Sequence, residues 1–174
     1  MIQKKYITII ILILIIIGSG FFIFKIFTKS TENKNLVGHI DMSAENKAKV
    51  CKDPTCTNPK PGFIDFEVSN KEPFTINNEN EISGKIFGNE LGWIVFNPPQ
   101  GGVYLTDTNT GLLQGIALSE TSGEINFSAT GQKVVINPTT RELEGYAWAS
   151  GPYGGWIKFD CQNGSCVRIK WEEI

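Results

Sequence analysis

Histidine is almost absent from this chain, which has 174 residues and a single histidine, His39. A Ser-His-Asp or Cys-His catalytic site would have to be built on that one side chain. His39 lies in a degenerate segment close to a polar stretch, so we expect an exposed strand histidine there. The sequence therefore offers almost no material for nucleophile–base catalysis, and we expect a protein that is not an enzyme.

The chain also lacks a charge excess and, beyond residue 35, a helical repeat. Its 16 basic and 18 acidic residues give a net charge of −2, without the basic footprint of a nucleic-acid-binding protein. No segment after residue 35 repeats apolar residues at spacings of three and four, the period of an amphipathic helix. We therefore expect no nucleic-acid partner, and a body without helices.

Metal and cofactor motifs are equally sparse. Residues 107–111 resemble the start of a calcium loop, but Leu118 stands at position twelve, where such a loop needs a bidentate glutamate. We interpret residues 107–111 as a turn, and we expect neither a metal nor a cofactor.

One long apolar run is present near the start of the chain. Residues 6–24 carry no charge and are almost wholly apolar, with Lys4 and Lys5 before them and Lys25 and Lys29 after them. As a helix with a rise of about 1.5 Å per residue, this segment spans the roughly 30 Å hydrocarbon core of a bilayer. The expected organisation is a cytoplasmic N-terminus (1–5), a transmembrane signal anchor (6–24), a spacer (25–35) and an extracytoplasmic body (36–174).

Two other interpretations of the apolar run stay open. A cleavable signal peptide would use the small residues at 18–20, but cleavage there would leave the apolar residues 21–24 as a new terminus. A pilin-like assembly helix would usually carry an acidic residue near its start, which this segment lacks. We favour the uncleaved anchor, which predicts a single-pass protein of the cell membrane with its body outside.

The four cysteines fall into two pairs of the same spacing. Cys51 and Cys56 have four residues between them, as do Cys161 and Cys166. The simplest pairing closes two small loops, although four cysteines allow three connectivities. A zinc site of four thiolates is the alternative, but such sites belong mostly to reducing compartments. We favour disulfides in an extracytoplasmic body.

A glycine followed by alternating apolar residues recurs four times in the body. The segments begin at Gly62, Gly92, Gly123 and Gly155, which lie 30, 31 and 32 residues apart. An apolar-x-Gly-x-apolar segment precedes each and a short β-branched piece follows, and the period of two inside these pieces favours strands. We therefore expect an all-β fold of about four three-stranded antiparallel units. A stacked or rolled sheet is favoured, because these units are short for propeller blades.

Comparison of the four units predicts which side chains face the core. Two positions of the Gly-x-Ile-x-Phe strand never change, whereas the position after the glycine accepts both tryptophan and glutamate and is expected to face outward. Residues 41–61 are expected to be an insertion in the first unit. The expected core residues are Ile64, Ile94, Ile125, Ile157, Phe66, Phe96, Phe127 and Phe159.

The last unit reads Leu-Glu-Gly-Tyr-Ala-Trp (143–148) and then Gly-Trp-Ile-Lys-Phe (155–159). This pattern resembles the secreted surface repeat proteins of candidate-phyla (Patescibacteria-type) bacteria, whose units combine Leu-Ser-Gly-Tyr-Ala-Trp with Gly-Trp-Ile-x-Phe. The third unit departs from the pattern, with Leu118 and Glu124 in place of tryptophan. The resemblance implies a surface or envelope protein, and it carries no catalytic residues.

Aromatic side chains are the remaining candidates for recognition. Exposed tryptophan and tyrosine rings can stack on sugars or anchor a protein partner, although they can also pack against one another across strands. We expect a structural or adhesive role at the cell envelope, with a glycan- or protein-binding module as the alternative. Envelope polysaccharide or another surface protein is the expected partner. The candidate binding residues are Trp93, Tyr104, Tyr146, Trp148, Tyr153 and Trp156.

Overall fold

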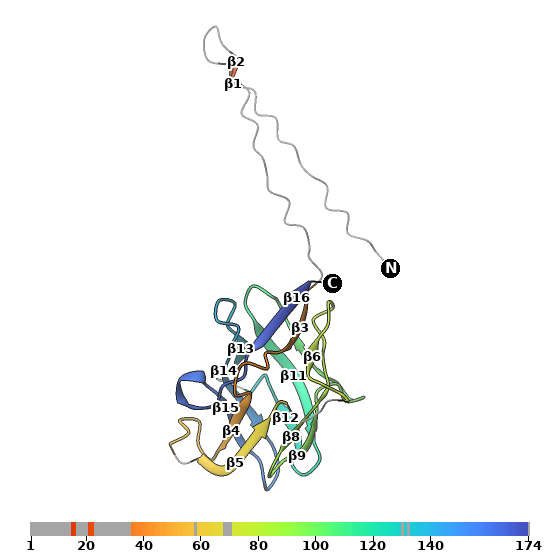
Figure 1. Cartoon of the computed structure of the whole chain (residues 1–174), viewed down its shortest axis with the longest axis vertical. Helices are drawn as coiled ribbons and strands as arrows, with labels where there is room; N and C mark the ends of the chain where they lie inside the picture. The colour runs from red at the N-terminus through yellow and green to blue at the C-terminus, as the bar shows by residue number, and fades with distance from the viewer. Residues whose placement is uncertain are drawn as a thin grey trace. The chain divides into compact units, whose positions relative to one another are not determined.

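Strands make up the body of the chain, as the repeat predicts. The computed structural model describes residues 15–16, 21–22, 36–57, 59–67, 71–129, 131 and 133–173 (Figure 1). The all-β class is confirmed for the body, whose described segments are strands and turns with one short 3₁₀ helix, η1 (Cys161–Asn163). Its strands are β3 (Leu36–Ile40), β4 (Lys47–Cys51), β5 (Pro59–Asp65), β6 (Thr75–Ile76), β7 (Ile82–Ser83), β8 (Lys85–Gly88), β9 (Gly92–Val95), β10 (Val103–Leu105), β11 (Leu112–Ser119), β12 (Gly123–Asn126), β13 (Val134–Ile136), β14 (Leu143–Ala149), β15 (Gly155–Phe159) and β16 (Ile169–Glu173).

The chain separates into two compact parts, residues 1–33 and the body, residues 34–174. In the first part, β1 (Ile15–Ile16) pairs antiparallel with β2 (Phe21–Phe22). Apart from these four positions, the helix expected over residues 6–24 lies outside the described residues, as does the spacer, so the membrane anchor stays a prediction. In the described part of the chain, no helix has both the length and the apolar character needed to cross a membrane.

Four hairpins, one from each repeat unit, close into a ring that we call the hairpin ring. The hairpins are β4–β5, β8–β9, β11–β12 and β14–β15. Neighbouring hairpins pair antiparallel through β5–β8, β9–β11, β12–β14 and β15–β4. The structure therefore has the rolled sheet, closed on itself, among the arrangements that the repeat left open.

The third strands of the units form a second closed layer, the cap ring. Strand β6 pairs with β3 and β7, and β13 pairs with β11 and β14. Strand β10 pairs with β11 and meets the second unit through the Glu81–Tyr104 bridge. Strand β16 pairs with β3 along five residues, and the Glu142–Arg168 bridge connects the start of β16 to the start of β14 in the fourth unit. Each third strand thus joins its own unit to the next, and β16 joins the last unit to the first.

The prediction of one long insertion at residues 41–61 is wrong, because β4 lies inside it. Residues 47–50 alternate inward and outward side chains, and residues 47–51 pair with both β5 and β15, which completes the hairpin ring. The first strand of unit one is therefore β3 and β4, interrupted by residues 41–46. At the end of this interruption, the buried Asn46 has a φ of 51° and donates to the Asp41 and Ala44 carbonyls and to Glu67.

Glycine marks the place where the first strand of each later unit passes from one ring to the other. Gly84, Gly115 and Gly145 have φ values of 114°, 104° and 98°. A Cβ at these positions would lie 2.3, 1.9 and 1.8 Å from the backbone carbonyl oxygens of Pro73, Gly102 and Lys133. Only glycine fits there, which explains the glycine of the recurring apolar-x-Gly-x-apolar segment.

The core is built from the residues that the repeat keeps constant. All four isoleucines and all four phenylalanines of the Gly-x-Ile-x-Phe strands are buried, with 1–3% of their surface exposed. The phenylalanines contact one another in a closed circle, the phenylalanine ring: centroids lie 6.2 Å apart for Phe66–Phe96, 5.7 Å for Phe96–Phe127, 6.4 Å for Phe127–Phe159 and 6.1 Å for Phe159–Phe66. Phe74 packs on this ring, 4.9 Å from Phe96.

Removal of one member of the phenylalanine ring is expected to destabilise the whole body. Phe127→Ala should lower the free energy of unfolding by about 3–5 kcal/mol, because it leaves a cavity between two units. Phe63→Ala is the matched control, since Phe63 is 44% exposed, and should cost about 1 kcal/mol at most. Urea denaturation of the full-length chain measures both, and equal losses would contradict a central role for the ring.

Gly115→Ala tests the passage between the rings. The added Cβ would lie 1.9 Å from the Gly102 carbonyl oxygen, and the alanine would have to adopt a φ of 104°. We therefore expect the free energy of unfolding to fall by about 2–5 kcal/mol. Gly131→Ala isolates the backbone cost, because Gly131 has a φ of 80° and nothing within 4 Å of the added Cβ. That control should lose about 1–2 kcal/mol by the same urea measurement. A loss for Gly115→Ala no larger than that of the control would rule out the proposed clash.

Candidate binding surface

Three of the predicted aromatic residues gather on the outer face of the fourth hairpin. Trp148 on β14 and Trp156 on β15 are a cross-strand pair, with ring centroids 4.9 Å apart at 64°. Tyr146 packs edge-on against Trp156, with centroids 6.4 Å apart. They face outward because side chains alternate along a strand and the neighbouring residues, Ala147 on β14 and Ile157 on β15, point into the core. We call Tyr146, Trp148 and Trp156 the aromatic cluster; Trp148 keeps 39% of its surface exposed.

An ion pair adjoins the aromatic cluster. Lys158 pairs across the strands with Tyr146, its Nζ 6.0 Å from the tyrosine ring centroid and 3.1 Å from Asp160 Oδ2. The hydrogen bond with Asp160 raises the pKa of Lys158. Partial burial by itself would raise the pKa of Asp160, but hydrogen bonds from Asn163 and Lys158 lower it. Both groups are therefore held in their charged forms beside a hollow of about 320 Å³.

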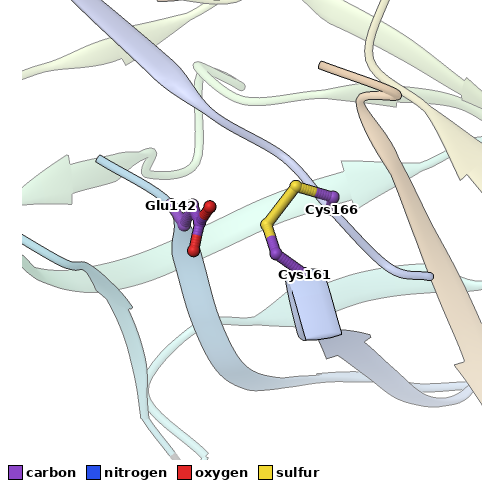
Figure 2. Close-up of side chains that lie close together, drawn as sticks. All are labelled: Glu142, Cys161 and Cys166. Carbon is purple, nitrogen blue, oxygen red and sulfur yellow. A yellow bond between two sulfur atoms is a disulfide. The ribbon is translucent and has the colours of Figure 1, made fainter. Parts of the chain in front are cut away.

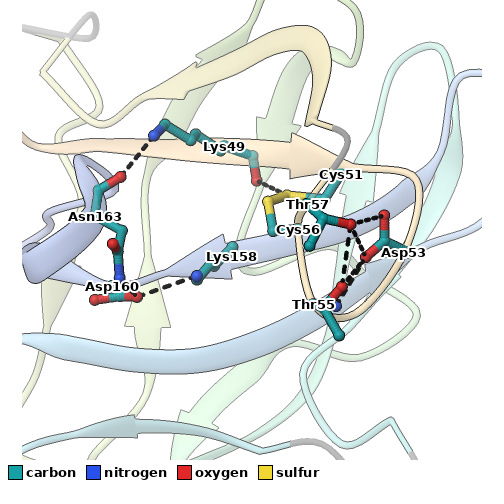
Figure 3. The surroundings of a disulfide bond; sticks show 9 residues. All are labelled: Lys49, Cys51, Asp53, Thr55, Cys56, Thr57, Lys158, Asp160 and Asn163. Carbon is teal, nitrogen blue, oxygen red and sulfur yellow. Dashed lines mark hydrogen bonds and ion pairs between the residues drawn. A yellow bond between two sulfur atoms is a disulfide. The ribbon is translucent and has the colours of Figure 1, made fainter.

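The first disulfide lies next to this region, at the seam where β15 pairs with β4. Cys51 is bonded to Cys56, as the spacing predicts. Asp53 accepts hydrogen bonds from the backbone N–H and hydroxyl of Thr55 and from the hydroxyl of Thr57, which ties the loop to itself (Figure 3). Across the seam, Lys49 Nζ donates to the Asn163 carbonyl oxygen at 2.6 Å. The loop is thus fastened by covalent and polar contacts.

The second disulfide closes the loop between β15 and β16. Cys161 is bonded to Cys166, so both local pairings are confirmed and the zinc alternative lacks its thiolates. Figure 2 shows Glu142 beside this disulfide, with its carboxylate within 4.8 Å of both sulfurs. The carboxylate accepts a hydrogen bond from Arg168 at 2.7 Å, which raises the pKa of the guanidinium. The group is an ion pair against a disulfide, which offers no thiolate to a metal.

Trp93 lies apart from the aromatic cluster, in a groove between the second and third hairpins. Its indole is 40% exposed and packs edge-on against Phe87, with centroids 5.4 Å apart. The groove has a volume of about 590 Å³ and an apolar floor of Val95 and Leu118. Ser119 and four charged side chains complete its lining: Lys71, Glu72, Lys85 and Glu120. We call this hollow the Trp93 groove.

The other two predicted aromatic residues lie elsewhere. Tyr104 is on β10 in the cap ring, where its hydroxyl donates to Gln114 Oε1 at 3.2 Å and its ring lines a hollow of about 420 Å³. Tyr153 is in the turn between β14 and β15 and is 56% exposed. Described ring contacts therefore join only three of the six predicted residues.

Phe87 was missed by the sequence analysis, although the hairpin register contains the signal that finds it. Counting outward from the turn pairs Gly88 with Gly92 and Phe87 with Trp93. The same register identifies equivalent outward positions in every hairpin. At three of these positions, the side chains of the four hairpins differ in chemical character. The sets are Lys47, Lys49 and Phe63; Lys85, Phe87 and Trp93; Ile116, Leu118 and Glu124; and Tyr146, Trp148 and Trp156.

The described titratable groups give little support to general acid catalysis. The pKa of Asp41 is lowered by hydrogen bonds from Ser43, and that of Glu172 by Lys170. A general acid for glycoside hydrolysis needs a raised pKa instead. His39 is half-buried on β3, and its Nε2 lies 4.0 Å from Glu172 Oε2. It is therefore a strand histidine beside a carboxylate.

Comparison with known proteins adds no relative. No protein-family model, no curated protein and no solved structure matches this chain.

The lowered pKa of Asp160 predicts a pH-dependent contribution to stability. A carboxyl group whose pKa is lower in the folded chain stabilises it above its unfolded pKa of about 3.9, and this stabilisation is lost as the pH falls through the folded value. The difference in unfolding free energy between the parent and Asp160→Asn should therefore be largest near pH 6 and shrink as the pH falls toward about 3.

Urea denaturation of the full-length chain across this range measures that difference. Lys158→Met removes the ion-pair partner, so its difference from the parent should shrink in the same window. A difference between the parent and Asp160→Asn that stays constant with pH would contradict the assigned role of the ionised carboxylate.

Proposed function

We propose that this chain is a single-pass membrane protein whose extracytoplasmic body has an adhesive or structural role at the cell envelope and catalyses no reaction. The observation that carries the proposal is the aromatic cluster, which lies on the outer face of a sheet whose core is complete without it. Tryptophan and tyrosine dominate the binding energy of many protein interfaces. Rings held edge to face on two paired strands lose little conformational freedom on binding.

Three further features support an extracytoplasmic setting. Both cysteine pairs are disulfides, which persist in oxidising compartments. The apolar run at residues 6–24 has the length of a membrane anchor. The resemblance of the last unit to secreted surface repeats suggests the same setting.

Two other functions stay as candidates. A glycan- or protein-binding module is favoured by the Trp93 groove, which combines an exposed indole with charged side chains. A pilin-like subunit would require processing at the N-terminus, and the intact mass of the mature chain would reveal it.

Surface display and adhesion test the proposed role in one experiment. The full-length chain carries an epitope tag at its C-terminus in a bacterial host, and its retention of isolated cell envelopes is measured on intact cells. We expect the tag to be accessible on intact cells and the parent to retain envelopes. Trp148→Ala with Trp156→Ala should weaken retention by about tenfold or more, because two interface anchors are lost.

Phe63→Ala is the matched control, since Phe63 occupies the position equivalent to Trp156 in the first hairpin and should retain envelopes like the parent. A tag reached only after permeabilisation would contradict the extracytoplasmic body. Equal retention by the parent and the displayed double variant, or none by either, would contradict the adhesive role of the aromatic cluster.

A further inference from the structure

The Trp93 groove differs from the aromatic cluster at equivalent positions of the repeat. Where the fourth hairpin has Tyr146, Trp148 and Trp156, the second has Lys85, Phe87 and Trp93. Lys85 occupies the position equivalent to Tyr146, so the second hairpin has an ammonium group where the fourth has an aromatic ring. The single indole of the second hairpin therefore lies beside charged side chains. The groove volume of about 590 Å³ falls in the range of small-ligand sites, roughly 300–1,000 Å³.

We propose that the Trp93 groove binds a neutral pyranose sugar at the end of a glycan chain. This deepens the binding-module candidate stated above and rests on it, because it narrows the ligand of the groove to one chemical class; it does not require that the aromatic cluster has a partner. A pyranose presents C–H groups on one face and hydroxyls around its edge. The groove presents the complementary features, an exposed indole with an apolar floor and polar groups at its rim.

Trp93 is positioned by one contact of its ring and one of its backbone. Phe87 packs against it edge-on, and Glu120 from the next hairpin turn accepts a hydrogen bond from the Trp93 backbone N–H at 3.3 Å. Val95 and Leu118 are neighbours across the β9–β11 seam and line the same groove. A sugar ring stacked on Trp93 would thus cover apolar surface that the fold leaves exposed.

The rim supplies hydrogen-bonding groups without a net charge. Lys85 Nζ lies 2.6 Å from Glu72 Oε2, and both side chains are about half exposed, at 41% and 52%. An ammonium beside a carboxylate offers a donor and an acceptor to neighbouring hydroxyls. Two lysines, Lys71 and Lys85, balance the two glutamates of the lining, Glu72 and Glu120. This balance favours a neutral ligand over a polyanion or a polycation.

Calorimetric titration of the full-length chain tests the proposal, in a detergent whose headgroup is not a sugar. The probes are neutral oligosaccharides ending in glucose, galactose, mannose or N-acetylglucosamine, with heparin as the polyanionic comparison. We expect saturable binding of at least one neutral probe. Trp93→Ala should weaken it by about tenfold or more, the scale of losing one aromatic stacking partner, and Lys85→Gln should weaken it while leaving the fold intact.

Phe63→Ala is the matched control, because Phe63 occupies the position equivalent to Trp93 in the first hairpin and lies outside the groove, and this variant should bind like the parent. Failure of every neutral probe to bind the folded parent would overturn the proposal, as would tighter binding of heparin. Equal loss in Trp93→Ala and Phe63→Ala would also overturn it, since binding would then not belong to this groove. The adhesion experiment uses substitutions in the aromatic cluster, so the two proposals fail separately.

Discussion

The contact among Phe66, Phe96, Phe127 and Phe159 is the constraint on which the rest of the body depends. Each phenylalanine comes from a different unit and touches the next, so the four units share one centre. A single repeat unit cannot bury its hydrophobic face alone and needs its neighbours to complete the core. The aromatic side chains bury large apolar areas where the units meet, and the sheet closes around them.

Closure explains why the glycines recur with the phenylalanines. The first strand of each later unit must pass from the cap ring to the hairpin ring while a neighbouring backbone lies close to it. Gly84, Gly115 and Gly145 permit this because a Cβ would overlap a carbonyl oxygen at each position. Unit one solves the same problem differently, with residues 41–46 and the buried, hydrogen-bonded Asn46. Core and backbone therefore set the period of the repeat together.

The sequence allowed the strands and their inward faces to be predicted, because a period of two and a comparison of four units are local information. Closure could not be predicted, since it depends on pairings such as β15–β4 and β16–β3 between distant segments. The sequence pattern places β4 in an insertion, because residues 41–46 interrupt the pattern that the other units keep. The aromatic residues were named as one set, whereas register and ring geometry divide them between the aromatic cluster, the Trp93 groove and two isolated positions.

Closure also determines how this body can recognise a partner. A sheet edge offers unpaired backbone groups to an incoming strand, but the hairpin ring, within the described residues, pairs each strand on both sides. A partner of the hairpin ring would then contact outward side chains, and these are the positions that differ among the hairpins. Because the inward positions are fixed by the phenylalanine ring, the outward ones can change without loss of the core. One hairpin can thus carry an aromatic cluster and another an indole beside an ion pair, on the same backbone.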